Sequence, residues 1–413
     1  MSEPPEDAPA PGADATDTGR DPRPDRPGER DRPGERDRPG ERDRPGERDR
    51  PGERDQPGEP VPPVLLDLLA AHGPSGYERA PAAVWREAAG GFAQVSSDVM
   101  GTPLALVAPK HGFEGSPKRL LVMGHIDEIG LIVTHVDDEG FLWFRTVGGW
   151  DAQVLVGQRL LLDTANGPLA GVVGRKPIHL LREEDRKKVA DVREMHIDIG
   201  ARDGEQAREL VRVGDVAVID AQPRELPNGR LVARALDNRL GSFVALQAAR
   251  LVAQAGGAQW ELAAVAAVQE EITFGGSRTS AFSLRPDAAI VLDVTHATDA
   301  PGIDVKEAGK HELGSGPVIS RGSTLDQGLF ELLLASAEAE GIPFTIEASA
   351  RATGTDADAV HISRGGVPTA LVSIPLRYMH SPVELVQLDD VHATARLIAA
   401  FALRLQADGA FGR

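Results

Sequence analysis

The chain has 413 residues, long enough for one large domain or two ordinary ones, and carries a formal net charge of −18. This acidic excess argues against non-specific binding to nucleic acid, and an aromatic content of 4% leaves few side chains to stack on bases. The absence of cysteine excludes disulfides, thiolate zinc sites and cysteine nucleophiles. Because we find neither an apolar stretch of transmembrane length nor the apolar core of a signal peptide, we expect a cytoplasmic protein without membrane contacts.

Residues 1–60 differ in composition from the rest of the chain. The hexamer Arg-Pro-Gly-Glu-Arg-Asp begins at residues 26, 32, 38, 44 and 50. Each unit is charge-neutral, contains Pro-Gly and has no apolar side chain, so it cannot contribute to a core. A β-helix can also show a six-residue period, but its repeats need apolar positions that stack inward. We therefore predict a disordered tail.

The folded part is predicted to begin at about residue 61 with short helices and strands. These elements are two helices, at 63–69 and 78–89, and five strands, at 92–97, 102–108, 119–124, 130–135 and 141–144. The strand at 119–124 leads directly into His125. We assign residues 61–147 to the first part of an α/β domain.

Between residues 148 and 234 the pattern changes to short β-rich runs separated by turns, and only residues 205–210 have a helical pattern. This composition predicts a small β-rich domain inserted into the α/β domain. The insertion contains His179 and His196, but neither stands near other residues that could bind a metal. We interpret both as ordinary polar or partly buried histidines.

Residues 235–413 return to the α/β pattern, with strands and helices in alternation. The predicted helices are at 240–254, 326–340 and 388–405, and the predicted strands are at 263–268, 288–292, 316–320, 344–347 and 370–374. This order predicts a mostly parallel sheet with helices on both faces. Residues 61–147 and 235–413 would together form this domain.

Four of the predicted strands are followed by side chains that can bind metals or move protons. One more such residue precedes the predicted helix at 240–254. Together these side chains are His125, Asp127, Asp237, Glu270, Glu271, Asp293 and His380. Ligands bind at the carboxyl ends of strands in open α/β sheets. Imidazole and carboxylate without thiolate suit catalytic zinc, cobalt or manganese. The set exceeds what one open catalytic metal usually takes, so it predicts two ions sharing a carboxylate.

Each residue of this set also has a simpler interpretation when it is considered alone. Glu270 and Glu271 could be the solvated start of a loop, and Asp237 could be the N-cap of a helix. Asp127 lies two residues after His125, on the same side of the strand, and is placed to hold the other imidazole nitrogen. Of the two adjacent glutamates, one can bind metal while the other stays free as a base. No Gly-x-Ser-x-Gly elbow, Walker loop or dinucleotide fingerprint offers a competing site.

Several motifs of the chain resemble those of the M42 family of dinuclear metallo-aminopeptidases. They are Gly124-His125-Ile126-Asp127-Glu128-Ile129-Gly130, Ala235-Leu236-Asp237-Asn238-Arg239, Gln269-Glu270-Glu271, Val291-Leu292-Asp293, Arg377-Tyr378-Met379-His380-Ser381-Pro382-Val383-Glu384 and Gly354-Thr355-Asp356-Ala357. The resemblance runs from about residue 62 to 407. It implies an enzyme that removes N-terminal residues from peptides.

The resemblance also implies a role for each site residue. Two divalent ions, zinc, cobalt or manganese, would share Asp237, with Glu271 and His380 completing one sphere and His125 and Asp293 the other. Glu270 would act as general base on a metal-bound water, and Asp127 would orient His125.

The inserted domain would serve in subunit contacts, which implies a homo-oligomer between a dimer and a dodecamer. One departure concerns the residues after the glutamate pair. The family usually continues with Val-Gly and then Arg-Gly-Ala, whereas this chain has Ile272-Thr273-Phe274-Gly275-Gly276-Ser277. Two alternatives are a deacylase or deblocking enzyme with the same metals, and a catalytically silent metal-binding assembly protein. The presence of Glu270 argues against the silent protein, because a scaffold needs no base beside its ligands.

Overall fold

The computed structural model describes residues 60–110 and 117–412. The predicted disordered tail lies outside the described residues, except for Pro60. Among the helices of the described ranges, none combines the length and apolarity that crossing a bilayer requires.

The larger part of the described chain is built on an eleven-stranded sheet. Nine strands follow in the order β1 (Gln94–Ser97), β2 (Pro103–Val107), β12 (Glu261–Ala267), β3 (Arg119–His125), β13 (Ala288–His296), β16 (Thr369–Arg377), β17 (Glu384–Gln387), β11 (Arg230–Ala233) and β10 (Arg224–Leu226). β14 (Val318–Gly322) pairs with β16 and with β15 (Thr345–Ser349). The four central strands, β12, β3, β13 and β16, are parallel to one another. Every other pair of neighbours in this order is antiparallel.

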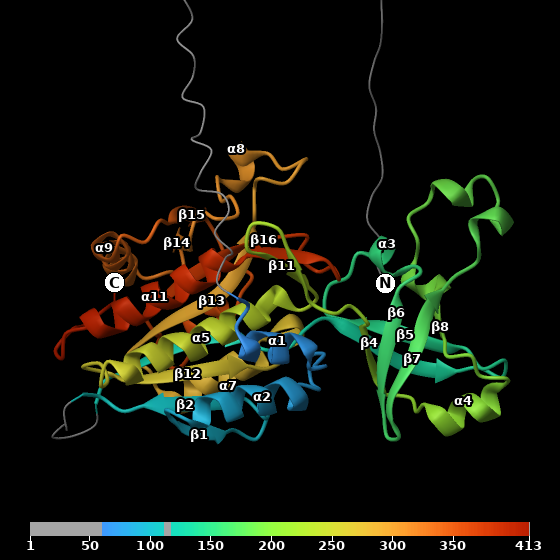
Figure 1. Cartoon of the computed structure of the whole chain (residues 1–413), viewed down its shortest axis with the longest axis horizontal. Helices are drawn as coiled ribbons and strands as arrows, with labels where there is room; N and C mark the ends of the chain where they lie inside the picture. Colours follow the sequence, from blue (N-terminus) through green and yellow to red (C-terminus); the bar gives the residue numbers. More distant parts are fainter. Residues whose placement is uncertain (1–59, 111–116, 413) are drawn as a thin grey trace, which may run out of the picture. The chain divides into compact units, whose positions relative to one another are not determined.

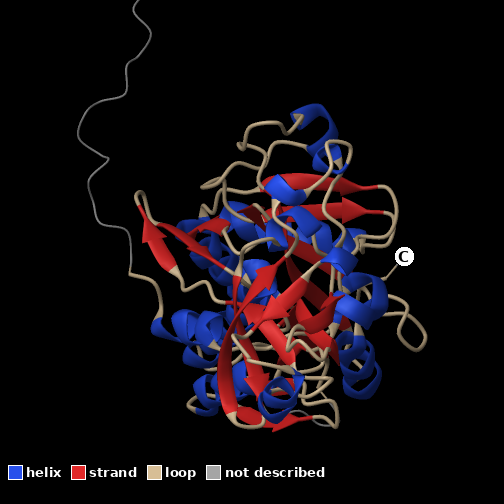
Figure 2. Ribbon diagram, turned by 90° about the vertical axis from the view of Figure 1, so that its right-hand side faces the viewer, coloured by secondary structure: helices blue, strands red, loops and turns tan. Residues whose placement is uncertain are grey.

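Helices cover both faces of this sheet (Figures 1 and 2). One face packs against α1 (Pro63–Ala70), α2 (Arg79–Gly90), α5 (Leu236–Gln254), α9 (Gln327–Glu340) and α11 (Leu388–Arg404). The other packs against α7 (Gly275–Leu284) and α10 (Ala357–Val360), and two one-turn helices, α6 (Glu270–Thr273) and α8 (Val305–Ala308), follow β12 and β13. On β3, Leu120 and Val122 enter the first core and Leu121 and Met123 the second. A strand buried on both faces needs a continuous apolar run, which explains its sequence.

The remaining strands close into a six-stranded barrel. Their order is β4 (Gly130–Val136), β5 (Leu142–Val147), β8 (His196–Asp198), β7 (Gly167–Gly174), β6 (Arg159–Thr164) and β9 (Val216–Ile219). The barrel has its own apolar core, which includes Leu131, Phe144, Leu162 and Ile197. Its connections carry α3 (Ala152–Leu155), α4 (Gly204–Leu210) and three short 3-10 helices, η1 (Ile178–Leu180), η2 (Asp185–Lys187) and η3 (Val192–Glu194).

The predicted fold class is confirmed, but the boundaries of the inserted domain differ from the prediction. We placed its start at residue 148, whereas β4 and β5 already belong to the barrel. We placed its end at residue 234, whereas β10 and β11 join the large sheet through β17. Short half-buried strands have the same alternating pattern in a barrel and in an open sheet, so only their hydrogen-bond partners distinguish the two.

Candidate metal centre

The predicted site residues meet at the carboxyl ends of the central parallel strands. His125 is the last residue of β3, and Asp293 lies in β13. After β12 the chain turns through Gln269, whose φ of 60° is left-handed, and Glu270 and Glu271 follow as the first residues of α6. His380, also left-handed with a φ of 58°, lies between β16 and β17.

Asp237 stands at the start of α5 but does not cap the helix. Residues 237 and 238 are non-helical, and the backbone N–H of Gly241 donates to the side chain of Asn238 at 2.8 Å. The carboxylate of Asp237 instead faces the two histidines. Its Oδ1 lies 3.2 Å from Nε2 of His125 and its Oδ2 lies 3.4 Å from Nε2 of His380. Each oxygen therefore faces a different imidazole, as expected of a bridging carboxylate.

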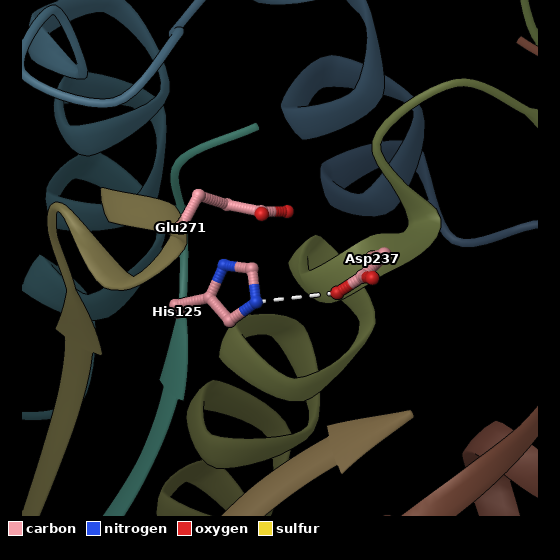
Figure 3. Close-up of side chains that lie close together, drawn as sticks. All are labelled: His125, Asp237 and Glu271. Atoms are coloured by element: carbon pink, nitrogen blue, oxygen red, sulfur yellow. Dashed lines mark ion pairs between the residues drawn. The ribbon is translucent and has the colours of Figure 1, made fainter. Parts of the chain in front are cut away.

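The glutamate pair approaches the same two imidazoles, and Figure 3 shows one member of the pair, Glu271, beside His125 and Asp237. Oε1 of Glu271 lies 3.3 Å from Nε2 of His380, and Oε2 of Glu270 lies 3.8 Å from Nε2 of His125. Ligand atoms of His125, Asp237 and Glu271 lie within 4.8 Å of one another, and so do those of His125, Glu270 and Asp293. The fold thus brings the predicted metal-binding residues together, but His380 belongs to neither of these two groups, and Glu270, predicted as the base, belongs to the second.

Asp127 is fully buried and holds the turn that carries the two glutamates. Its Oδ1 accepts the backbone N–H of Glu270 and its Oδ2 that of Glu271, both at 3.1 Å. Oδ2 also accepts the hydroxyl of Ser75. Nδ1 of His125 lies 3.5 Å from Oδ1 but makes no hydrogen bond of ordinary geometry among the described residues. The contact to His125 was predicted, whereas the hold on the glutamate backbone was not.

The electrostatics of the cluster favour the binding of a cation. Burial raises the pKa of Glu270 to about 10, with the charges of Asp293, Asp356 and Glu271 adding to the shift. Burial also raises the pKa of Asp293 well above its ordinary value. Hydrogen bonds to Asp237 and then Glu271 raise the pKa of His380 to about 11. Carboxylates so close together cannot all ionise without a compensating charge. Buried carboxylate oxygens and imidazole nitrogens are also the donors that zinc, cobalt and manganese accept, so the residues fit such ions.

Buried carboxylates without a role in the sequence prediction also lie at the site, among them Glu78 and Asp356. Oε1 of Glu78 accepts the backbone N–H of Gln269 at 3.0 Å and that of Gly76 at 2.6 Å. Asp356 is 1% exposed, and neither of its oxygens has a hydrogen bond of ordinary geometry among the described residues. Burial raises its pKa to about 6. Asp356 belongs to a turn that we singled out as a motif, but Glu78 binds a residue 191 positions away, for which the sequence carries no signal.

The departure from the M42 pattern after Glu271 falls in the junction between α6 and α7. Phe274 has a left-handed φ of 55°, and Gly276 packs so closely on the residue after β12 that a Cβ there would lie 2.4 Å from the backbone nitrogen of Val268. Ile272 is 48% exposed beside the glutamates. The departure therefore leaves an exposed apolar side chain directly after the glutamate pair.

A pocket opens next to Asp237, Glu271 and His380. It is lined by residues of the large sheet and its loops and also by residues of the barrel and its connections, among them Trp150 and Ile219. The barrel therefore contributes to the walls of the candidate site. Of the two histidines of the insertion, His179 is exposed and His196 packs edge-on against Phe141 with ring centroids 4.8 Å apart. Neither joins a metal-binding group among the residues that the structure describes.

The comparisons with family models, curated proteins and solved structures all indicate the same family. The family model described as M42 glutamyl aminopeptidase matches residues 105–397. The lysyl aminopeptidase of Pyrococcus furiosus is 36% identical over 317 residues, which cover 76% of this chain and 88% of that protein.

Two solved structures show the same similarity. The TET aminopeptidase of the marine sediment archaeon Thaumarchaeota archaeon SCGC AB-539-E09 has a TM-score of 0.77 at 35% identity, covering 83% of this chain and 96% of its own. The TET1 peptidase of Pyrococcus horikoshii has a TM-score of 0.73 at 32% identity, with 83% and 99% covered, and is described as assembling into a tetrahedron or a large octahedral shell.

Proposed function

Because the chain belongs to the M42 family of aminopeptidases, and is therefore a hydrolase of that class, we propose that it removes N-terminal residues from peptides with two divalent metal ions. The observation that carries the two-metal proposal is the position of Asp237. Its two oxygens face two different imidazoles, at 3.2 and 3.4 Å. With a single ion, one of the two imidazoles beside Asp237 would have no ion to bind. Two ions, in contrast, can share one bridging carboxylate in this arrangement.

We assign the ligands as the sequence predicted. Asp237 belongs to both ions, Glu271 and His380 complete one sphere, and His125 and Asp293 complete the other. The close approach of His380 to both Asp237 and Glu271 supports the first set. The position of Asp293 on the strand next to His125 supports the second. Zinc and cobalt suit these donors best, and manganese is the alternative.

When bound, such ions lower the pKa of a water molecule and polarise the carbonyl group of the scissile bond. The protein supplies the proton carrier. Glu270 is adjacent to a ligand but stands outside both assigned spheres, and Asp127 fixes its backbone. Its carboxylate takes the proton from the attacking water and returns it to the nitrogen of the leaving amine, as a general base and then a general acid.

We further propose that the protein forms a homo-oligomer through the barrel. Several large apolar side chains are exposed on the barrel strands and their connections, namely Val156, Val172, Ile178, Leu180, Val189 and Val213. Exposed apolar groups gathered on a small domain often mark a contact surface. The shells described for the Pyrococcus horikoshii peptidase support the proposal, and peptides are the substrates that its family suggests. Light scattering of the full chain tests it, and a monomer at micromolar concentration contradicts it.

The proposed mechanism is tested by Glu270→Gln. The amide preserves shape but cannot take a proton, so kcat on an aminoacyl chromogenic substrate should fall by about 10²–10⁴-fold. Metal content should stay at the wild-type value. Glu87→Gln, on the exposed side of α2, serves as the matched control and should change neither quantity. Assays with added zinc, cobalt and manganese identify the active ion. The assignment of Glu270 fails if the variant keeps more than a tenth of the wild-type rate.

A further inference from the structure

Glu384, the first residue of β17, is a buried carboxylate to which no role has been assigned above. It is 2% exposed. Its Oε2 accepts the backbone N–H of Asp237 at 3.1 Å, and its Oε1 accepts the backbone N–H of His380 at 3.0 Å. One side chain thus joins two segments that are far apart in the sequence, and both segments deliver a residue assigned to the same metal ion.

The two histidines of the site differ in how packing holds them. The side chain of His125 is 2% exposed at the end of a central strand, whereas that of His380 is 35% exposed. His380 also has a left-handed backbone, as does Tyr378 two residues before it, and this conformation is unfavourable for residues other than glycine. The side chains of Tyr378 and Val383 in the same loop are about half exposed. Met379 packs against the core of the large sheet, and the backbone hydrogen bond from His380 to a buried acceptor adds a second anchor to this half-exposed loop.

We propose that Glu384 is a positioning residue that holds Asp237 and His380 at the separation needed to bind one metal ion. This inference rests on the ligand assignment proposed above. Glu384 acts through the backbone of the two ligands and lies outside both proposed coordination spheres. Positioning groups of this kind commonly change metal affinity by 10–100-fold when they are replaced.

The bonding pattern makes a carboxylate necessary at this position. The two N–H groups bind two different oxygens of Glu384. Glutamine has nearly the same shape but only one acceptor oxygen, so its NH₂ group would face one of the two backbone N–H groups. A role in filling space predicts that glutamine is tolerated, whereas the positioning role predicts that it is not. The two explanations therefore give opposite outcomes for one substitution.

The chain offers a matched control in Asp390 of α11. This residue is 1% exposed, and its two oxygens accept the backbone N–H groups of Gly314 and Gly316, both at 2.7 Å. The bonding pattern equals that of Glu384, but none of the segments joined carries an assigned metal ligand. Asp390→Asn should therefore lower the melting temperature without changing metal affinity.

The experiment titrates metal-free wild type, Glu384→Gln and Asp390→Asn with Co²⁺, followed by visible absorption and by the number of ions retained after dialysis. We expect two ions in the wild type and in Asp390→Asn. We expect Glu384→Gln to bind one ion as the wild type does and the other 10–100-fold more weakly, with an altered absorption band. Glu384→Asp, which keeps two acceptor oxygens, should recover part of the lost affinity and stands in if the glutamine variant does not fold.

Wild-type affinity of both sites in Glu384→Gln would overturn the inference, and so would an affinity loss matched by Asp390→Asn. An aspartate variant no better than the glutamine variant would also contradict it. His380→Ala separates this failure from that of the proposed metal site. If His380→Ala binds both ions normally, the ligand assignment is wrong; if it loses one ion while Glu384→Gln keeps both, only the positioning role is wrong.

Discussion

The close approach of β3 and α5 at Gly124 gives the most direct test of how the fold builds the site. A Cβ added to Gly124 would lie 2.4 Å from the carbonyl carbon and 2.7 Å from the Cα of Gly241, and 2.7 Å from the nitrogen of Ser242. These are backbone atoms within a buried helix, so they cannot rotate out of the way. Gly124→Ala must therefore move α5 and β3 apart by about 1 Å to restore ordinary contact distances.

The displacement should cost both stability and activity. Forcing a methyl group into a packed core typically costs about 1–3 kcal/mol. The lower entropy of the unfolded alanine chain offsets about 0.4–1 kcal/mol of this, so we expect a net loss of about 1–2 kcal/mol in the free energy of unfolding. His125 directly follows Gly124, and Asp237 stands one turn before Gly241, so the 3.2 Å contact between these two side chains should lengthen. A misplacement of about 1 Å can reduce kcat by about 10²-fold.

Urea denaturation and kcat on an aminoacyl substrate measure the two effects. The control is Gly90→Ala in α2, where an added Cβ would meet nothing within 4 Å. This exposed helical position should become slightly more stable, by about 0.5–1 kcal/mol, without change in kcat. A Gly124→Ala variant as stable and active as the wild type would refute the idea that this glycine sets the distance between the two ligands.

Two further predictions concern charge. Glu128 is 3% exposed and pairs with Arg234 and Arg239, so Glu128→Gln should lower the free energy of unfolding by about 3–5 kcal/mol at pH 7. Burial opposes ionisation of Glu128, but the two guanidinium groups lower its pKa below the ordinary 4.5, so its contribution is present above pH 4.5 and lost as the pH falls further. Denaturation curves at pH 7 and below pH 4 should show this difference shrinking in acid, and a constant difference would contradict it. Because the pKa values of Glu270 and His380 are raised to about 10 and 11 without metal, binding of the ions at pH 7 should release more than one proton, and affinity should rise with pH. Calorimetry in buffers of different ionisation enthalpy measures the release, and an equal heat in all buffers would disprove it.

The sequence by itself was sufficient to predict which side chains the fold brings together at the carboxyl ends of its parallel strands. Apolar runs ending at His125, Glu270 and Asp293 indicated parallel strands, and parallel strands direct their carboxyl ends to one edge of a sheet. The pairing of β12, β3 and β13 agrees with this expectation. This prediction succeeds because the helical segments between these apolar strands are crossover connections, which make the strands parallel and bring their carboxyl ends to one edge.

Tertiary structure decided what depends on which segments meet. The strands at 130–147 have the same alternating pattern in a barrel and in a sheet, and only their hydrogen-bond partners place them in the barrel. The sequence left open whether Asp237 caps a helix or is shared by two ions, and the structure places its carboxylate between two imidazoles. Glu384 binds backbone N–H groups. Every residue except proline carries such a group, so the sequence does not indicate which residues Glu384 binds. Ligand types are therefore recorded in the sequence, whereas the groups that hold those ligands in place become evident only when distant segments are brought into contact.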